Sequence, residues 1–316
     1  MGTPAQIICV GQAVVDCITE NIDKSSDKKN VYRAHSISLN VGGDAFNESV
    51  ILSRLGHSVQ ILCGMGNDLA GDLILSRLTC TSVDTSLITR SDSLSTPVAN
   101  IILTSGRDRQ SVSSEAARLE GYSPPTDGIS GCRILSLASL FRAPLDRPEQ
   151  ILSLVKAARD GGAVICADTK LPTFRLLDLE DLRDVLPYID YIFPNEAEAS
   201  YYSGRSDYSA MADAFLNRGV GHVIIKTGAK GCFAKSSSEC FSVPSFPVNA
   251  VDSTGAGDNF AAGFISALLH GEGFHDCCLF ATAAAACSVT CIGTTSGVQS
   301  RRQVEEFLAL QNEKQT

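Results

Sequence analysis

The chain has 316 residues, 44% of them hydrophobic and 19% charged, which is enough for one large α/β domain with a substantial core. Its net charge of −9 argues against a broad nucleic-acid-binding surface, because such a surface needs clustered Lys and Arg. The twelve cysteines form no C-x-x-C pair and no Cys/His cluster at zinc spacing, so we expect reduced thiols buried among apolar residues.

Apolar, β-rich runs alternate with helical stretches along most of the chain, the pattern of a mainly parallel sheet covered by helices. Strands are expected at 7–10, 59–63, 134–137, 163–167, 191–193 and 222–226. Helices are expected at 45–55, 72–78, 148–160, 179–186, 208–218 and 259–269. Several of these helices are followed by a glycine, which is a common C-terminal cap.

Two stretches break this alternation. Residues 18–39 and 96–115 both have extended pieces around a polar turn, and we expect them to form hairpins outside the main sheet. Together they would make a small β-lid at the sheet edge, although two unrelated surface excursions would leave the same pattern. In the second turn, Arg107 and Arg109 are candidates for binding an anionic group, and a solvated hairpin tip explains them equally well.

The apolar runs give no sign of a membrane protein. No positively charged stretch precedes the first apolar run, and Gln6 stands where a myristoylation motif has Ser or Thr. Residues 277–292 form the longest uncharged apolar run, which is short for a membrane span and is expected to be a buried helix. We therefore expect a cytoplasmic protein with no membrane or nucleic-acid partner.

The usual nucleotide-binding signatures are absent from the sequence. No G-x-x-x-x-G-K-[ST] motif occurs, and no G-x-G-x-x-G follows the first strand. A P-loop enzyme and a Rossmann dehydrogenase are therefore both disfavoured.

The run VDSTGAGDNF at 251–260 is the strongest chemical feature of the sequence. Gly255, Ala256 and Gly257 lead into the helical pattern that starts at Asn259, so small residues expose N–H groups where the helix dipole favours an anion. Asp258 would repel a phosphate there. It is better explained as a base for an incoming hydroxyl, although a helix cap is the structural alternative.

The same run resembles the C-terminal signature of the ribokinase/phosphofructokinase-B family of carbohydrate kinases. Residues 41–56, which begin VGGDAFNES, are similar to the family's sugar-binding motif, and NEAE at 195–198 resembles its N-x-x-E motif. Residues 11–16 and 226–231 also follow the family's order, so the match runs from about residue 7 to residue 298. It implies one domain over 1–316, a ribokinase-like three-layer α/β/α fold with a mainly parallel central sheet and a small β-lid.

The resemblance implies transfer of the ATP γ-phosphate to a primary hydroxyl of a small sugar. Asp258 would be the base, and the N–H groups of Gly255, Ala256 and Gly257 would form an anion hole. Asn195 and Glu198 would act on the Mg²⁺–phosphate side through metal-bound waters, although they also fit a capping box. The remaining residues implied for nucleotide binding are Lys226, Gly228 and Gly231.

The resemblance also implies two further sites. The sugar would be bound by Asp16, Gly42, Gly43 and Asn47, since carboxylate and amide groups can orient hydroxyls. A monovalent cation such as K⁺ would be bound by Asp252 and Thr254 together with backbone carbonyls of Ser288, Cys291 and Gly293.

Three positions depart from the family pattern. Asp44 stands where relatives often have Lys or Ala, and a carboxylate there would disfavour an acidic sugar or demand a cation nearby. Lys170 stands in a loop where fructokinase-like relatives have Asn or Arg, and it is a candidate contact for the substrate or a nucleotide phosphate. The alanine-rich stretch 281–286 would pack against the adenine pocket, or simply within the core.

Two alternatives to a sugar kinase stay open at this point. A nucleoside kinase of the same family would need an aromatic shelf for the base, for which only Phe46, Tyr122 and Phe141 are available. A sugar- or nucleotide-sensing relative would keep the fold without catalysis, although it would have no need of Asp258. The lid hairpins have apolar faces, so we expect a homodimer joined through the lids.

Overall fold

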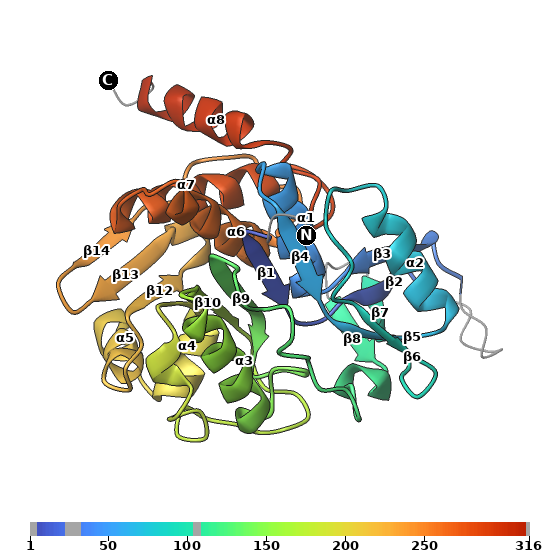
Figure 1. Ribbon diagram of the computed structural model, residues 1–316. Coiled ribbons are helices and arrows are strands. Elements are labelled where there is room, and N and C mark those ends of the chain that lie inside the picture. The colour runs from blue at the N-terminus through green and yellow to red at the C-terminus, as the bar shows by residue number, and fades with distance from the viewer. Residues whose placement is uncertain (1–4, 23–32, 104–108, 314–316) are drawn as a thin grey trace.

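The computed structural model describes residues 5–22, 33–103 and 109–313. Its main sheet is built from β1 (Ile7–Val10), β4 (Val59–Leu62), β9 (Ile134–Leu140), β10 (Val164–Thr169), β11 (Tyr191–Phe193), β12 (His222–Lys226), β13 (Cys232–Ser236) and β14 (Cys240–Val243). The strand order is β14-β13-β12-β11-β10-β9-β1-β4 (Figure 1). The strands from β4 across to β12 pair in parallel, and β13 and β14 add an antiparallel edge.

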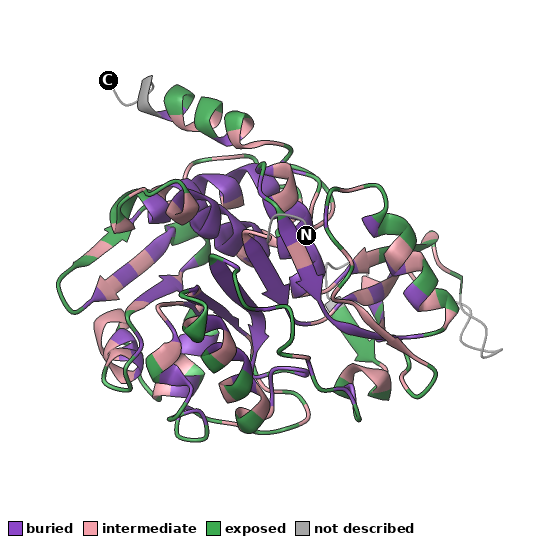
Figure 2. Cartoon of the chain, in the orientation of Figure 1, coloured by how far each residue is buried: buried purple, intermediate pink, exposed green. Residues whose placement is uncertain are grey.

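Helices cover both faces of this sheet. One face carries α1 (Asp44–Arg54), α6 (Ala256–Leu269) and α7 (Phe274–Ser288), with α8 (Arg301–Glu313) outside α7. The other carries α3 (Pro148–Asp160), α4 (Glu196–Ser203) and α5 (Tyr208–Leu216). Alternate residues of β1 point into the two cores, Ile7 into one and Ile8 into the other, and the central strands β1, β9 and β10 are almost wholly buried (Figure 2). The three-layer α/β/α prediction is confirmed.

A second sheet of four strands lies beyond the β4 edge. It consists of β2 (Val14–Glu20), β3 (Ser36–Gly42), β7 (Val98–Leu103) and β8 (Arg109–Ser113), in the order β3-β2-β7-β8. Each expected hairpin is antiparallel, and β2 pairs with β7 in parallel, so the two segments form one sheet. The helix α2 (Leu69–Leu78) and the short strands β5 (Gly64–Gly66) and β6 (Thr89–Ser91) lie beside it. Arg107 lies outside the described residues.

One of the six helix predictions is wrong, and two other helices begin three residues earlier than expected. Residues 179–186 form turns followed by the 3₁₀ helix η3 (Leu186–Tyr188). The carboxylate of Asp178 accepts the N–H groups of Glu180 and Asp181 in the manner of a helix N-cap, but Pro187 disfavours helical backbone at the residue before it, and the segment stays in turns. The helix α2 begins at Leu69 instead of residue 72, and α6 begins at Ala256 instead of Asn259. Small residues have no apolar periodicity, so they concealed the first turn of α6.

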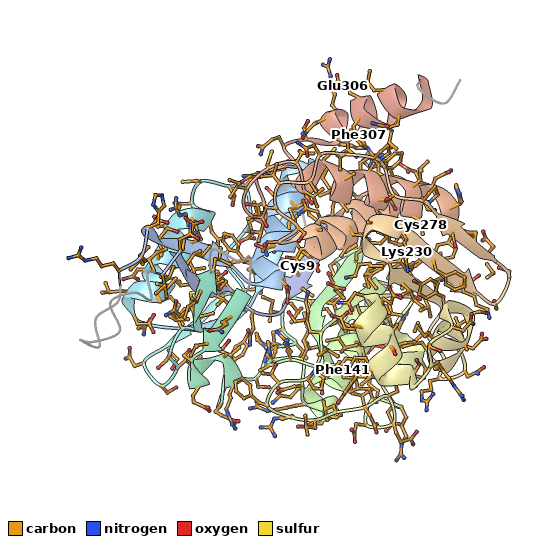
Figure 3. All side chains as sticks on the ribbon, turned by 180° about the vertical axis from the view of Figure 1, so that it is seen from behind. Cys9, Phe141, Lys230, Cys278, Glu306 and Phe307 are labelled. Atoms are coloured by element: carbon orange, nitrogen blue, oxygen red, sulfur yellow. The ribbon has the colours of Figure 1, made fainter. Side chains whose placement is uncertain are left out.

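The cysteines are all free thiols, as predicted. Eight are buried, among them Cys9 on β1 and Cys278 on α7 (Figure 3), and burial raises the pKa of both well above its ordinary value. Residues 277–288 belong to the buried helix α7. No helix in the described ranges is both long and apolar enough to cross a membrane.

Candidate active site

Polar residues gather where the parallel strands end. The carboxyl ends of parallel strands meet at one edge of a sheet, and ligands of open α/β folds bind outside that edge. Asp168 lies at the end of β10 and Lys226 at the end of β12, and the N-terminus of α6 reaches the same place. This edge therefore holds the residues that the sequence motifs singled out.

Asp258 lies in the first turn of α6 and is only 4% exposed. Its Oδ2 accepts a hydrogen bond from Asn47 Nδ2 at 2.7 Å, and Asn47 Oδ1 accepts one from Thr294 Oγ1 at 3.1 Å. Burial, followed by the nearby carboxylate of Asp44, raises the pKa of Asp258 to about 7, against the opposing charge of Lys170. A carboxyl that ionises near neutral pH is well suited to general-base work.

The approach to α6 leaves room for an anion. Gly255 has φ +78°, and a Cβ there would lie 2.8 Å from Thr294, so this position requires glycine. Gly257 faces Lys226, whose Nζ would lie 3.3 Å from a Cβ on Gly257. The first N–H groups of a helix have no acceptor within the helix, so the start of α6 at Ala256 and the ammonium of Lys226 present positive charge together.

Lys170 is surrounded by three carboxylates. Its Nζ lies 3.2 Å from Asp44 Oδ1, 3.5 Å from Asp168 Oδ2 and 3.7 Å from Asp258 Oδ1. Burial opposes the charge of Lys170, but these carboxylates outweigh it and raise its pKa well above the ordinary value. Asp44 is also held by Ser139 Oγ at 2.8 Å. The cation that a carboxylate at position 44 demands is therefore Lys170.

Asn195 and Glu198 form a capping box at the start of α4. Asn195 Oδ1 accepts the N–H of Glu198 at 2.9 Å, and Glu198 Oε2 accepts the N–H of Asn195 at 2.9 Å. Glu198 also accepts from Asn195 Nδ2 at 2.7 Å and from Thr169 Oγ1 at 2.8 Å, and burial raises its pKa. The structural alternative is thus realised. Carboxylate oxygens have further lone pairs, so a metal-bound water can still be accepted.

The four residues expected to bind sugar lie near one another. Asp16 is on β2, and its Oδ2 would lie 2.8 Å from a Cβ on Gly42 at the end of β3. Gly43 has φ +93°, and a Cβ there would lie 2.5 Å from the carbonyl of Gln12 in the loop after β1. Asn47 is in the first turns of α1, which begins directly after Gly43. The second sheet, the end of β1 and α1 therefore meet here.

The residues expected to bind nucleotide around the turn between β12 and β13 differ in their surroundings. Lys226 Nζ donates to Asp168 Oδ1, which draws its side chain into the site. Gly228 begins the 3₁₀ helix η4 (Gly228–Lys230). Gly231 packs so closely on the carbonyl of Val243 in β14 that no side chain fits, which is reason enough for glycine there.

The residues expected around a monovalent cation lie in the loop before α6, at the end of α7 and in the loop that follows α7. Asp252 accepts the N–H of Thr254 and the N–H of Gly293, each at 2.9 Å. The carbonyl of Ser288 accepts the N–H of Cys291 at 3.3 Å. Over the described ranges, no group of three or more His, Cys, Asp and Glu side chains is arranged to hold a metal ion. A site here would depend on backbone carbonyls and Asp252.

The three aromatic residues that a nucleoside kinase could use as a shelf for the base are buried. Phe46 is 5% exposed, Tyr122 3% and Phe141 0%, so each belongs to the core. Phe141 stacks on Tyr202 with ring centroids 4.0 Å apart (Figure 3 shows Phe141 within the molecule). The sequence pattern identified aromatic residues but not their burial.

Several residues of this edge escaped the sequence reasoning. Asp168 and Thr294 contact the predicted residues directly, and Ser139 fixes Asp44. Asp168 follows a buried strand, which is a usable signal, whereas nothing local marks Thr294.

On the loop after β10, the half-buried ring of Phe174 is covered by the guanidinium of Arg118 at 4.7 Å from its centroid.

Comparison with known proteins agrees with this geometry. Residues 4–301 match the model of the pfkB family carbohydrate kinases. A ribokinase from Haemophilus influenzae is 30% identical over 282 residues, 84% of this chain and 87% of that protein.

Solved structures are similar over nearly the full length. The ribokinase crystal structure from Thermotoga maritima has a TM-score of 0.81 at 27% identity, covering 96% of this chain and 99% of that one. A putative ribokinase II from E. coli in complex with ATP and Mg²⁺ has a TM-score of 0.80 at 25% identity, covering 97% and 99%. The chain therefore belongs to the pfkB family of carbohydrate kinases, phosphotransferases that act on an alcohol acceptor.

Proposed function

We propose that this protein is an ATP-dependent carbohydrate kinase that transfers the γ-phosphate to a primary hydroxyl of a small sugar. The observation that carries the proposal is the place of Asp258, a buried carboxyl in the first turn of α6, beside Gly257 and the ammonium of Lys226. A base and an anion cradle thus adjoin, which is what phosphoryl transfer to a hydroxyl requires.

In the proposed reaction, Asp258 takes the proton of the acceptor hydroxyl while Asn47 holds the carboxylate in place. The N–H groups of Gly255, Ala256 and Gly257, together with Lys226, stabilise charge on the transferring phosphoryl group. Mg²⁺, when bound, neutralises phosphate charge, and Asn195 and Glu198 are its candidate holders through water.

The acceptor end favours a neutral sugar. Asp16 and Asn47 can each orient a hydroxyl, while Asp44 and Asp168 add negative charge beside them. The carboxylate of a sugar acid would be repelled there, since Lys170 is already surrounded by carboxylates. A pentose is the first acceptor to test, because a relative carries the name ribokinase.

An ADP-release screen across pentoses, hexoses, sugar acids and nucleosides tests the proposal, with Asp258→Asn as the inactive control. We expect Mg²⁺-dependent ADP release with at least one neutral sugar. Release with nucleosides alone would support a nucleoside kinase. Thermal stabilisation by a sugar without any ADP release would support a sensor.

We also infer a role for a monovalent cation. Asp252 and Thr254, with the carbonyls of Ser288, Cys291 and Gly293, are its candidate ligands, and the same loops lead into the anion cradle at Gly255. Replacing K⁺ by N-methylglucamine should lower kcat, and unchanged turnover would refute this role.

We further infer that the chain is one α/β domain whose second sheet acts as a lid and joins two copies. The side chains of Ile37 (69% exposed), Leu39 (56%) and Val112 (63%) are large and apolar. Leu39 and Val112 lie on the same face, since they align through Cys17 and Asn100, and Ile37 precedes Leu39 by two residues. Such a face is expected to be covered by a partner.

A further inference from the structure

Lys170 has no task in the reaction proposed above, yet its position is held tightly. Its backbone N–H donates to the carbonyl of Leu140 at 3.0 Å, and its carbonyl accepts from the hydroxyl of Tyr202 at 2.6 Å. Tyr202 in turn stacks on the buried ring of Phe141. These contacts fix the root of the side chain, which is only 22% exposed, and direct its ammonium between α1, β10 and α6.

The ammonium of Lys170 is committed to carboxylates. Its Nζ lies within 3.7 Å of one carboxylate oxygen of each of Asp44, Asp168 and Asp258. Lys226, by contrast, pairs with Asp168 and lies beside Gly257 at the start of α6. The two lysines therefore serve different sides of the site, Lys226 the phosphoryl side and Lys170 the acceptor side.

The charges around Asp258 do not balance without Lys170. Glu48 is fully buried and accepts from Ser136 Oγ at 2.6 Å, and burial raises its pKa well above the ordinary value. Without Lys170, the carboxylates of Asp44 and Asp258 would face each other with no cation between them. The charged and titratable groups that face Asp258 are Asp44 and Glu48 from α1, Asp168 from β10, Lys170 from the following loop, and Lys226 beside Gly257 from β12.

We propose that Lys170 is a positioning residue for phosphoryl transfer, which holds Asp44 and Asp168 in place and keeps Asp258 an anion ready to accept the hydroxyl proton. The proposal rests on Asp258 being the base of the proposed function. It differs from the reading of Lys170 as a phosphate ligand, because the three carboxylates around the ammonium would repel a phosphate. An opposite charge at this distance lowers the pKa of a carboxyl by about 1–3 units.

The test compares Lys170→Met, Lys170→Arg and the matched control Lys226→Met. Two quantities are measured: the pH dependence of kcat/KM, and the titration of the Asp258 carboxyl by ¹³C NMR of the ¹³C-aspartate-labelled protein, with Asp258→Asn used to assign the signal. In Lys170→Met, the apparent pKa of the acidic limb of the kcat/KM profile and the midpoint of the Asp258 NMR titration should both rise by about one pH unit or more. Raising the pH should then restore much of the rate. Lys170→Arg should stay close to the unmodified protein. Lys226→Met should raise the KM for ATP and leave the midpoint largely unchanged.

An unchanged midpoint in Lys170→Met, with a raised KM for ATP, would overturn the proposal and make Lys170 a phosphate ligand. The NMR titration needs no substrate, so failure to find any acceptor would refute the proposed function without deciding the role of Lys170. Should Lys170→Met not fold, Asp44→Asn provides the opposite test. Removing that carboxylate frees Lys170 for Asp258 and should lower the midpoint, and a midpoint that rises or does not move would count against the proposal.

Discussion

Replacing Asp258 by Asn should make the protein inactive and, at alkaline pH, more stable. The substitution keeps the size of the side chain, and the amide oxygen can still accept the hydrogen bond from Asn47 Nδ2 that is 2.7 Å long here. It removes the carboxylate that Asn47 contacts, which is the proposed acceptor of the hydroxyl proton. Loss of a general base lowers kcat by about 10²–10⁴-fold, while ATP binding should survive.

The gain in stability follows from the raised pKa of Asp258, which is about 7 in the folded protein against an ordinary value of 3.8. Below pH 4 the carboxyl is neutral in both the folded and the unfolded chain, so it contributes no pH-dependent penalty. Between pH 4 and 7 the Asp258 carboxyl is ionised in the unfolded chain but stays largely protonated in the folded protein. The free energy of unfolding therefore falls by about 1.4 kcal/mol per pH unit. Above pH 7 the penalty is constant at about 4 kcal/mol.

The assay is urea unfolding of both proteins at pH 5.5 and pH 8, together with ADP release in the presence of a responding sugar. We expect Asp258→Asn to be more stable by about 4 kcal/mol at pH 8 and by about half of that at pH 5.5. Equal stability of the two proteins at both pH values would show that folding does not raise the pKa of Asp258. Undiminished turnover would refute its assignment as the base.

Three further predictions test other parts of the molecule. Gly255→Ala places a Cβ 2.8 Å from Thr294 at φ +78° and should lower the free energy of unfolding by about 1–3 kcal/mol in urea titrations, together with kcat; a fully stable and active variant would contradict the fit of glycine here. Glu198→Gln keeps a residue suited to the capping box and should lose only about 1 kcal/mol, but the Mg²⁺ concentration for half-maximal rate should rise about tenfold, whereas an unchanged Mg²⁺ requirement would leave Glu198 a cap alone. Leu39→Asp should convert a dimer to a monomer in sedimentation, while Ser38→Asp on the opposite face should not; a monomeric unmodified protein would refute the lid interface.

Local patterns were enough to predict most of the elements and the run of small residues at the start of α6. Buried parallel strands are continuous apolar runs, and an anion cradle needs small residues just before a helix, so both are visible in short stretches of sequence. The same reasoning failed where the signal was weak. Residues 179–186 have a helix-like spacing of leucines but stay in turns before Pro187, and the first turn of α6 has no apolar residue to mark it.

The sequence by itself therefore determined the reaction class and the order of the strands along the chain, and it predicts Asp258 as the base. Only the tertiary structure decided the electrostatics around that base. Asp44, Lys170 and Asp258 belong to α1, the loop after β10 and α6, far apart in the chain, and they meet because parallel strands bring their carboxyl ends to one edge. Charge interactions depend on distance and burial in space, which no local pattern of residues records.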